Sequence, residues 1–364
     1  MIQKMSLERF RPLRPFDFLT LRPIALVSIL CLMPVSGLAG PQDCGAVPAE
    51  LRSSRPDPDG TPTQVAIGFF VLDLRSIQDS EQSFDGDVFL TASWKDPRLA
   101  EGFGEVRSGL AGCTVPLDQI WNPALQIVNQ RQLRKHSGDL VRIDDQGGVI
   151  YQQRFMGSFT SPLLLREFPF DSHRLRIEIG SVRHGPEEVA LVPDGKRTGR
   201  AERFTIADWS IGQGASRIDP LEVKAASRSF SRLIFELEAA RGRGFYLWKV
   251  LVPLSLIVFM SWSVFWIDPA QLSAQIGLST SAVLTLIAFQ FSLAYMLPRL
   301  SYLTRADRFV LGAAFLVFAA LAEAVATSYL ARRKKEQLAN RIDRTARWVF
   351  PLGYLSVLLV SFQL

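Results

Sequence analysis

The sequence predicts a β + α membrane protein, in which an extracellular immunoglobulin-like β-sandwich is followed by a four-helix transmembrane bundle. Three observations indicate this class. The N-terminus has a basic leader and a short apolar run, as in export signals. Short β-rich runs recur between residues 64 and 240. Four long apolar stretches then fill the chain from residue 241 to its end.

Composition supports a membrane protein. The chain has 364 residues, of which 48% are hydrophobic and 21% are charged. This is more apolar than is usual for a soluble protein of this length. Much of the formal charge of +6 comes from the leader and from a late basic cluster. The charge therefore does not indicate a nucleic-acid partner.

Residues 1–39 are predicted to be a secretory signal peptide. Basic residues precede the apolar run 24–33, and the small-residue site Gly37-Leu38-Ala39 follows it. The alternative, a membrane anchor, is disfavoured because the run is far shorter than the roughly 20 residues that span a bilayer. Cleavage would leave Cys44 and Cys113, and the sequence leaves open whether they form a disulfide. Residues 40–63 are predicted to be a flexible lead-in.

Residues 64–240 are predicted to form the exported domain. Many short strands at regular spacing indicate a sandwich or a barrel. Trp94 is followed by Asp96 and Arg98, a spacing that suits a structural ion pair under the indole. The local corners at Trp94–Leu99, Ile120–Leu125 and Phe168–Asp171 are, taken one by one, typical of packing rather than of a site.

The sequence gives no support for catalysis. Its histidines are His136, His173 and His184, and none has a carboxylate or cysteine at metal-ligand spacing. Phosphate-binding loops and nucleophile-elbow motifs are absent from the sequence. We therefore expect no enzyme activity, no cofactor and no metal, and a membrane-tethered hydrolase is disfavoured.

Residues 241–364 are predicted to form the membrane domain, with helices at about 245–267, 271–296, 308–330 and 348–364. Pro253 is expected to kink the first helix. Arginines and lysines crowd the predicted loop 331–347, which the positive-inside rule assigns to the cytoplasm. The large domain and both mature termini then lie outside, as the signal peptide also requires. Glu323 lies within the third helix and faces either protein or the interface.

The second predicted helix carries one distinctive stripe. Its members are separated by three or four residues and so share one helix face. They are Gly277, Ser281, Leu284, Ala288, Phe291 and Tyr295. The stripe grades from small and polar to bulky and apolar, so several copies of the helix could surround a water-filled pore with a dry constriction. A helix-packing face is the alternative, because small residues and hydroxyls also line dry bundles.

Several motifs in order resemble the prokaryotic branch of the pentameric ligand-gated ion channels, the Cys-loop receptor superfamily, from about Gln64 to Leu364. The motifs are Trp94-x-Asp96-x-Arg98-Leu99, Trp121-Asn122-Pro123, Arg154 to Phe159, Phe168-Pro169-Phe170-Asp171, Tyr246-Leu247-Trp248, Ser261 to Trp266, Leu297-Pro298-Arg299-Leu300 and Phe350-Pro351-Leu352-Gly353. Cysteines do not flank the Phe168–Asp171 turn, so apolar packing must hold it.

The resemblance implies a homopentamer whose pore is lined by the stripe, with Leu284 as the central gate and Phe291 as an outer apolar ring. It also implies a gating interface between the sandwich and the membrane. The residues expected there are Phe168, Pro169, Phe170, Asp171, Arg241, Pro298, Arg299 and Tyr302, together with the loop from about Ser76 to Ser83. An Asp171–Arg241 ion pair is expected, with Arg243 as a rival partner.

The resemblance also suggests a ligand site, for which the candidate residues are Trp121, Arg154, Arg183, His184 and Phe230. The loop from Gly212 to Ser229 has no aromatic residue, so an aromatic cage for an amine is not supported. Arg183, His184, Arg217 and Lys224 leave room for an anionic ligand or for proton sensing. The agonist is therefore expected to be a small molecule or protons.

We expect a weakly cation-selective channel in a bacterial inner membrane, by analogy with prokaryotic relatives. Ser273-Ala274-Gln275 would lie at the cytoplasmic pore mouth. The alternatives are an anion-selective channel and a non-conducting receptor of the same architecture. The expected partners are four further copies of the chain, membrane lipid, permeating inorganic ions and the agonist.

Overall fold

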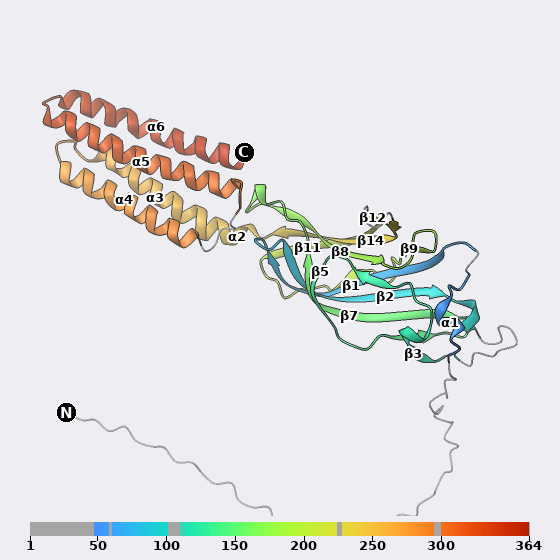
Figure 1. The fold of residues 1–364 in the computed structure, drawn as a ribbon. Helices are drawn as coiled ribbons and strands as arrows, with labels where there is room; N and C mark the ends of the chain where they lie inside the picture. Colours follow the sequence, from blue (N-terminus) through green and yellow to red (C-terminus); the bar gives the residue numbers. More distant parts are fainter. Residues whose placement is uncertain are drawn as a thin grey trace, which may run out of the picture. The chain divides into compact units, whose positions relative to one another are not determined.

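The structure is a computed structural model that describes residues 47–57, 60–100, 110, 112–223, 228–294 and 300–363. Strands dominate the chain from Thr63 to Arg241, and helices follow from Arg243 to Phe362 (Figure 1). The predicted signal peptide and several predicted site residues lie outside the described residues. These site residues are Cys44, Lys224, Tyr295, Pro298 and Arg299.

The strand domain has fourteen strands among the described residues. They are β1 (Thr63–Gln78), β2 (Ser83–Lys95), β3 (Thr114–Pro116), β4 (Leu125–Ile127), β5 (Gln130–Lys135), β6 (Leu140–Ile143), β7 (Gly148–Thr160), β8 (Ser172–Ser181), β9 (Val189–Pro193), β10 (Gly199–Arg200), β11 (Trp209–Ile218), β12 (Leu221–Val223), β13 (Arg228–Phe230) and β14 (Arg232–Arg241).

The strands form two main sheets and a small hairpin. The larger sheet has the order β10-β1-β2-β7-β6-β3, with β9 also paired to β1 and β5 also paired to β7. The smaller sheet has the order β11-β14-β8-β4, and β12 pairs with β13. No pairing between described strands joins the two main sheets, so the domain is a sandwich rather than a barrel.

Alternating side chains fill the space between the two sheets. Val65, Ile67 and Phe69 on β1 are fully buried, as expected for a strand with one face on the core. Phe69 meets Phe235 of β14 with ring centroids 5.8 Å apart. Burial of each such side chain contributes about 1.5–3 kcal/mol, so this layer contributes much of the stability of the domain.

The ion pair predicted after Trp94 is present. The Asp96 carboxylate accepts hydrogen bonds from Nε and Nη2 of Arg98 at 2.9 and 2.8 Å. The Trp94 ring meets Trp121 edge-on, with centroids 6.3 Å apart. The pair therefore fixes the corner that begins with the short 3-10 turn Pro97–Leu99.

Part of the predicted lead-in contacts the sandwich. Glu50–Ser53 form a short helix, α1. The backbone oxygen of Leu51 accepts a hydrogen bond from the amide of Trp121 at 2.8 Å, and Arg98 donates to the Ser54 hydroxyl at 2.8 Å. Leu51 also packs against the sandwich core, which explains why a Pro-rich segment is held. Cys113 is disulfide-bonded.

Four helical segments of the described chain are long and apolar enough to cross a membrane. The first, Arg243–Trp266, consists of α2 (Arg243–Tyr246), a π-helical turn (Leu247–Leu251), α3 (Val252–Trp262) and a 3-10 turn (Ser263–Trp266). The others are α4 (Leu272–Leu293), α5 (Arg305–Arg332) and α6 (Glu336–Phe362).

The distortion expected at Pro253 takes the form of the π-helical turn that immediately precedes α3. Proline lacks an amide hydrogen, and its ring crowds the carbonyl four residues earlier. A wider turn relieves this crowding without ending the helix. The helical path thus continues through the proline.

The fourth helix begins at Glu336, twelve residues before the predicted start at Trp348. Most of the predicted loop 331–347 is therefore helical. Ala339 and Asp343 lie on the buried face, whereas Arg341 and Arg344 are exposed. The high charge density suggests a loop, but the charges occupy one face of an amphipathic helix.

Candidate pore and gating interface

The two faces of α4 have opposite environments. Five members of the predicted stripe are exposed: Gly277, Ser281, Leu284, Ala288 and Phe291. Residues on the other face are buried against the helices of the same chain: Gln275, Ser279, Ala282, Leu286 and Leu293. Leu284 is 66% exposed and Phe291 is 69% exposed, values comparable with that of Phe315 on α5, which is 72% exposed. The sixth predicted member, Tyr295, lies outside the described residues.

Hydroxyl groups on the exposed face bond to their own helix. The Ser281 hydroxyl donates to the Gly277 carbonyl at 2.8 Å, and the Thr285 hydroxyl donates to the Ser281 carbonyl at 2.8 Å. Such bonds let a membrane helix carry hydroxyls while leaving oxygen lone pairs free for water. The N-terminal half of this face can therefore bind water, whereas the C-terminal half carries the apolar side chains of Leu284 and Phe291.

Gln275 does not lie where the sequence argument about the pore mouth placed it. Its side chain is buried, donates to the Ile267 carbonyl at 3.0 Å and accepts from the Ser328 hydroxyl at 2.8 Å. It therefore ties the start of α4 to α5 and to the preceding turn. Ser273 and Ala274 are exposed at this end of the helix.

The expected Asp171–Arg241 pair is present and bidentate. Arg241 donates from Nε to Asp171 Oδ1 at 2.9 Å and from Nη2 to Asp171 Oδ2 at 3.1 Å. The same Nη2 donates to Oδ1 of Asp79, in the turn between β1 and β2, at 2.7 Å. The rival Arg243 instead lies over the ring of Phe170, at 5.7 Å from its centroid.

Aromatic rings enclose the Arg241 guanidinium. It lies 4.3 Å from the ring centroid of Trp209 and 4.8 Å from that of Phe168. Such stacking adds a cation–π attraction that is strongest when the cation is desolvated. Burial alone would lower the pKa of Arg241, but its bonds to Asp171 and Asp79 raise it above its usual value. Arg241 therefore remains charged in this buried position.

The Phe168–Asp171 loop contacts the membrane helices directly. Its Phe168–Pro169 peptide bond is cis. The Phe168 carbonyl accepts a hydrogen bond from the amide of Ala306 in α5 at 3.1 Å. The Phe170 ring meets Phe362, at the end of α6, with centroids 5.4 Å apart. One loop of the sandwich thus touches the start of α5 and the end of α6.

Tyr302 also lies at this boundary. Its hydroxyl accepts a hydrogen bond from the backbone amide of Leu165 at 3.1 Å, and Arg166 lies over its ring at 5.7 Å. Nearby, Arg305 at the start of α5 pairs with Glu167 at 3.0 Å. Sequence reasoning identified Tyr302 and the loop, but it missed Asp79 as a specific partner and Trp209 entirely.

The predicted ligand-site residues do not form one cluster. Phe230 lines a pocket of about 250 Å³ with Val182 and Gln126, and Arg183 lines a neighbouring pocket that shares those two residues. Trp121 is buried, with its ring 5.4 Å from that of His184. Arg154 lies on β7 of the larger sheet and pairs with Asp87. The structure therefore brings Arg183 and Phe230 to adjoining pockets and separates Arg154 from them.

Glu323 faces protein rather than the membrane interface. Its carboxyl group lies against that of Asp343 in α6. The oxygen atoms of both groups are buried, and no donor within the described residues reaches them. The sequence alone left this choice open.

Comparison with known proteins identifies both halves of the chain. Residues 51–236 match the family model described as neurotransmitter-gated ion-channel ligand binding domain, and residues 250–338 match the model described as neurotransmitter-gated ion-channel transmembrane region. The chain belongs to the neurotransmitter-gated ion-channel family. This confirms the resemblance, the sandwich-plus-bundle fold and the expectation of a channel protein rather than an enzyme.

Two relatives of this family member are a bacterial and an animal protein. A proton-gated ion channel from Gloeobacter violaceus is 28% identical over 306 residues, which cover 84% of each chain. A gamma-aminobutyric acid receptor subunit beta from Lymnaea stagnalis is 28% identical over 309 residues, covering 79% of this chain and 61% of that one. With its four candidate spans, this family member is a multi-pass membrane protein.

Proposed function

We propose that this protein is a homopentameric ligand-gated ion channel whose pore is lined by the exposed face of α4. The observation that carries the proposal is the exposure of Gly277, Ser281, Leu284, Ala288 and Phe291 while the reverse face packs inside the chain. Hydroxyls in a bilayer need water or a protein partner. Symmetry-related copies around a central axis supply an aqueous column for this face.

The proposed orientation follows from the basic turn between α5 and α6. Arg332, Arg333, Lys334 and Lys335 are exposed there, and such clusters remain on the cytoplasmic side. An even number of spans then places the sandwich and the C-terminus on the same, outer side. In a bacterium this corresponds to the inner membrane with a periplasmic sandwich.

In the proposed gating mechanism, agonist binding shifts the sandwich, and the Phe168–Asp171 loop transmits the shift. The loop is suited to this role because Arg241 holds it and it contacts both α5 and α6. Opening then lets water return to the part of the pore lined by the apolar side chains of Leu284 and Phe291. An agonist acts by binding more tightly to the open arrangement than to the closed one.

The proposed agonist is a small molecule or a proton. One relative is named a proton-gated ion channel and another a gamma-aminobutyric acid receptor subunit. We propose weak cation selectivity by analogy with prokaryotic relatives. Gln275 is buried, so its side chain gives no argument for either sign of ion. Asp268 is the acid nearest the start of α4 in the sequence. Reversal potentials in asymmetric salt distinguish cation from anion conduction.

Leu284→Thr tests the pore, with Leu286→Thr as the matched control. Leu284 is exposed and Leu286, half a turn away, is fully buried. Replacing each leucine of the ring removes on the order of 1–2 kcal/mol of preference for the dry state. We therefore expect Leu284→Thr channels to leak or to open at lower agonist concentration in planar bilayers.

Leu286→Thr places a hydroxyl in the bundle core, so it should lower thermal stability without producing a leak. The proposal is contradicted if purified wild-type and Leu284→Thr proteins carry no current across a pH and ligand screen. It is also contradicted if the two variants change the current in the same way.

A further inference from the structure

His173 occupies a position in the gating interface that neither the sequence motifs nor the proposed function uses. Its side chain is 4% exposed, and Nε2 lies 2.6 Å from Asp171 Oδ2. The same oxygen accepts the Nη2 bond of Arg241. The imidazole and the guanidinium therefore share one carboxylate, which belongs to the loop that contacts α5 and α6.

The charges around His173 are not balanced when its ring is neutral. We call Asp79, Asp171, Arg241 and His173 the coupling cluster. Two carboxylates and one guanidinium give it one net negative charge, and a proton on His173 makes it neutral. Uncompensated charge is costly in a buried site, so protonation of His173 changes the stability of the coupling cluster.

The groups that face His173 belong to several elements. Asp171 precedes β8, Arg241 ends β14, Asp79 lies between β1 and β2, and Tyr246 of α2 lies beside the Arg241 guanidinium. The Trp209 ring of β11 lies 5.9 Å from the imidazole, and its charged neighbour Asp208 is exposed. None of these groups is another histidine.

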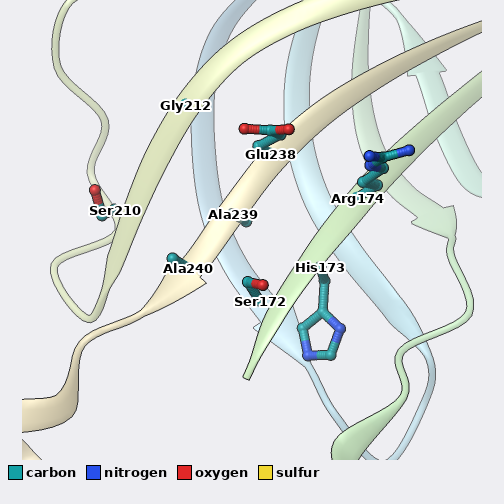
Figure 2. Close-up of a pocket in the computed structure, with 8 residues that line it drawn as sticks. All are labelled: Ser172, His173, Arg174, Ser210, Gly212, Glu238, Ala239 and Ala240. Atoms are coloured by element: carbon teal, nitrogen blue, oxygen red, sulfur yellow. The ribbon is translucent and has the colours of Figure 1, made fainter. Parts of the chain in front are cut away.

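Arg174 and Glu238 line a pocket of about 360 Å³ that His173 also borders. Their side chains, however, lie on the other side of the smaller sheet from the imidazole. Figure 2 shows the His173 ring leaving β8 on the side opposite to Arg174 and Glu238. This alternation follows from the period of a strand. The imidazole therefore responds to the coupling cluster rather than to the charges of Arg174 and Glu238.

We propose that His173 is a proton-binding site of the gating interface, through which external pH acts on the docking of the Phe168–Asp171 loop. This inference rests on the proposed channel function for its physiological meaning. Histidine is the side chain whose charge ordinarily changes between pH 5 and 8. A proton on His173 strengthens the hydrogen bond from its imidazole to Asp171 Oδ2. It thereby weakens the competing bond from Arg241 to the same oxygen.

The main test compares wild type with His173→Gln, since glutamine can still donate to Asp171 but cannot titrate. The matched control is His136→Gln, at an exposed histidine that follows β5 in the larger sheet. We expect open probability to depend on external pH between 5 and 8 in wild type and in His136→Gln. In His173→Gln the change in open probability between pH 8 and pH 5 should be at least about tenfold smaller. Retention of the full pH dependence in His173→Gln overturns the proposal.

Tryptophan emission gives a readout that needs no current. A protonated imidazole quenches a neighbouring indole, so wild-type protein should lose emission as pH falls from 8 to 5. The variants are made in a His184→Gln background, because the His184 ring lies 5.4 Å from that of Trp121 and would act in the same way. In that background His173→Gln should abolish this step, and Trp209→Phe should reduce it. If the step is present and depends on His173 while no variant conducts, the proton site stands and the channel proposal fails. A wild-type protein without the step overturns the proton site.

Asp79→Asn supplies a second variant that leaves His173 in place. It removes one negative charge from the coupling cluster, so a proton on His173 becomes less favourable. We expect the midpoint of the emission step to move to lower pH by on the order of one pH unit. An unchanged midpoint, or a shift to higher pH, contradicts the charge-balance argument.

Discussion

At Arg241 one guanidinium joins segments that are far apart in the chain. Asp171 could be predicted as its partner because loop position and charge complementarity both indicate it. Asp79 is 162 residues away from Arg241 in the sequence. Nothing in the local pattern distinguishes it from the other acids of the early loops. The Trp209 ring over the guanidinium depends on the pairing of β11 with β14, which a single sequence does not specify.

Asp171 gives a prediction for acid stability. Burial alone would raise its pKa, but hydrogen bonds from His173 and Arg241 and the charge of Arg241 hold the pKa below its usual value. A carboxyl group with a lowered pKa stabilises the fold above its unfolded pKa of about 3.9, and this contribution is lost as pH falls further. The thermal midpoint of the wild type should therefore decrease below about pH 4.

Asp171→Asn should remove this part of the acid dependence and should cost about 3 kcal/mol at pH 7, because it leaves the buried Arg241 incompletely paired. The exposed Asp145→Asn serves as control and should keep the wild-type profile. Thermal unfolding monitored from pH 3 to 8 provides the measurement. If the thermal midpoint of Asp171→Asn falls with pH in parallel with that of the wild type, the Asp171–Arg241 pair is not the source of the acid dependence.

At the scale of elements, α4 and α6 show what periodicity can and cannot predict. The three- and four-residue spacing on α4 placed the stripe on one helix face, and the structure exposes its five described members. The same spacing could not predict Gln275, because its amide reaches the Ile267 carbonyl and Ser328 through tertiary contacts. For α6, clustered arginines concealed a helix whose Ala339 face is buried.

The Glu323–Asp343 contact gives a prediction for the docking of α6 on α5. Glutamine at position 323 can donate an amide hydrogen to the Asp343 carboxylate, whereas alanine leaves that carboxylate buried without a partner. Glu323→Ala should therefore be about 1–3 kcal/mol less stable than Glu323→Gln. Thermal unfolding of the purified full-length variants measures the difference. Equal stability of the two variants would show that the contact does not hold α6.

For the molecule as a whole, the order of elements was predictable because it depends on composition: a β-rich domain followed by apolar helices. The family follows from both halves of the chain. The ligand site was not predictable in the same way. Arg154 and Phe230 are both plausible by residue type, but they lie on different sheets, and only the strand order shows this.

The central claim, that copies of α4 enclose water, is tested most directly by cysteine scanning of this helix in conducting membranes. We expect water-soluble thiol reagents to modify cysteines at the exposed positions Gly277, Ser281, Leu284, Ala288 and Phe291, and to change the current there. Cysteines at the buried positions Ala282, Leu286 and Leu293 should remain unmodified. Reaction at the second set, or no reaction at the first, would contradict the account.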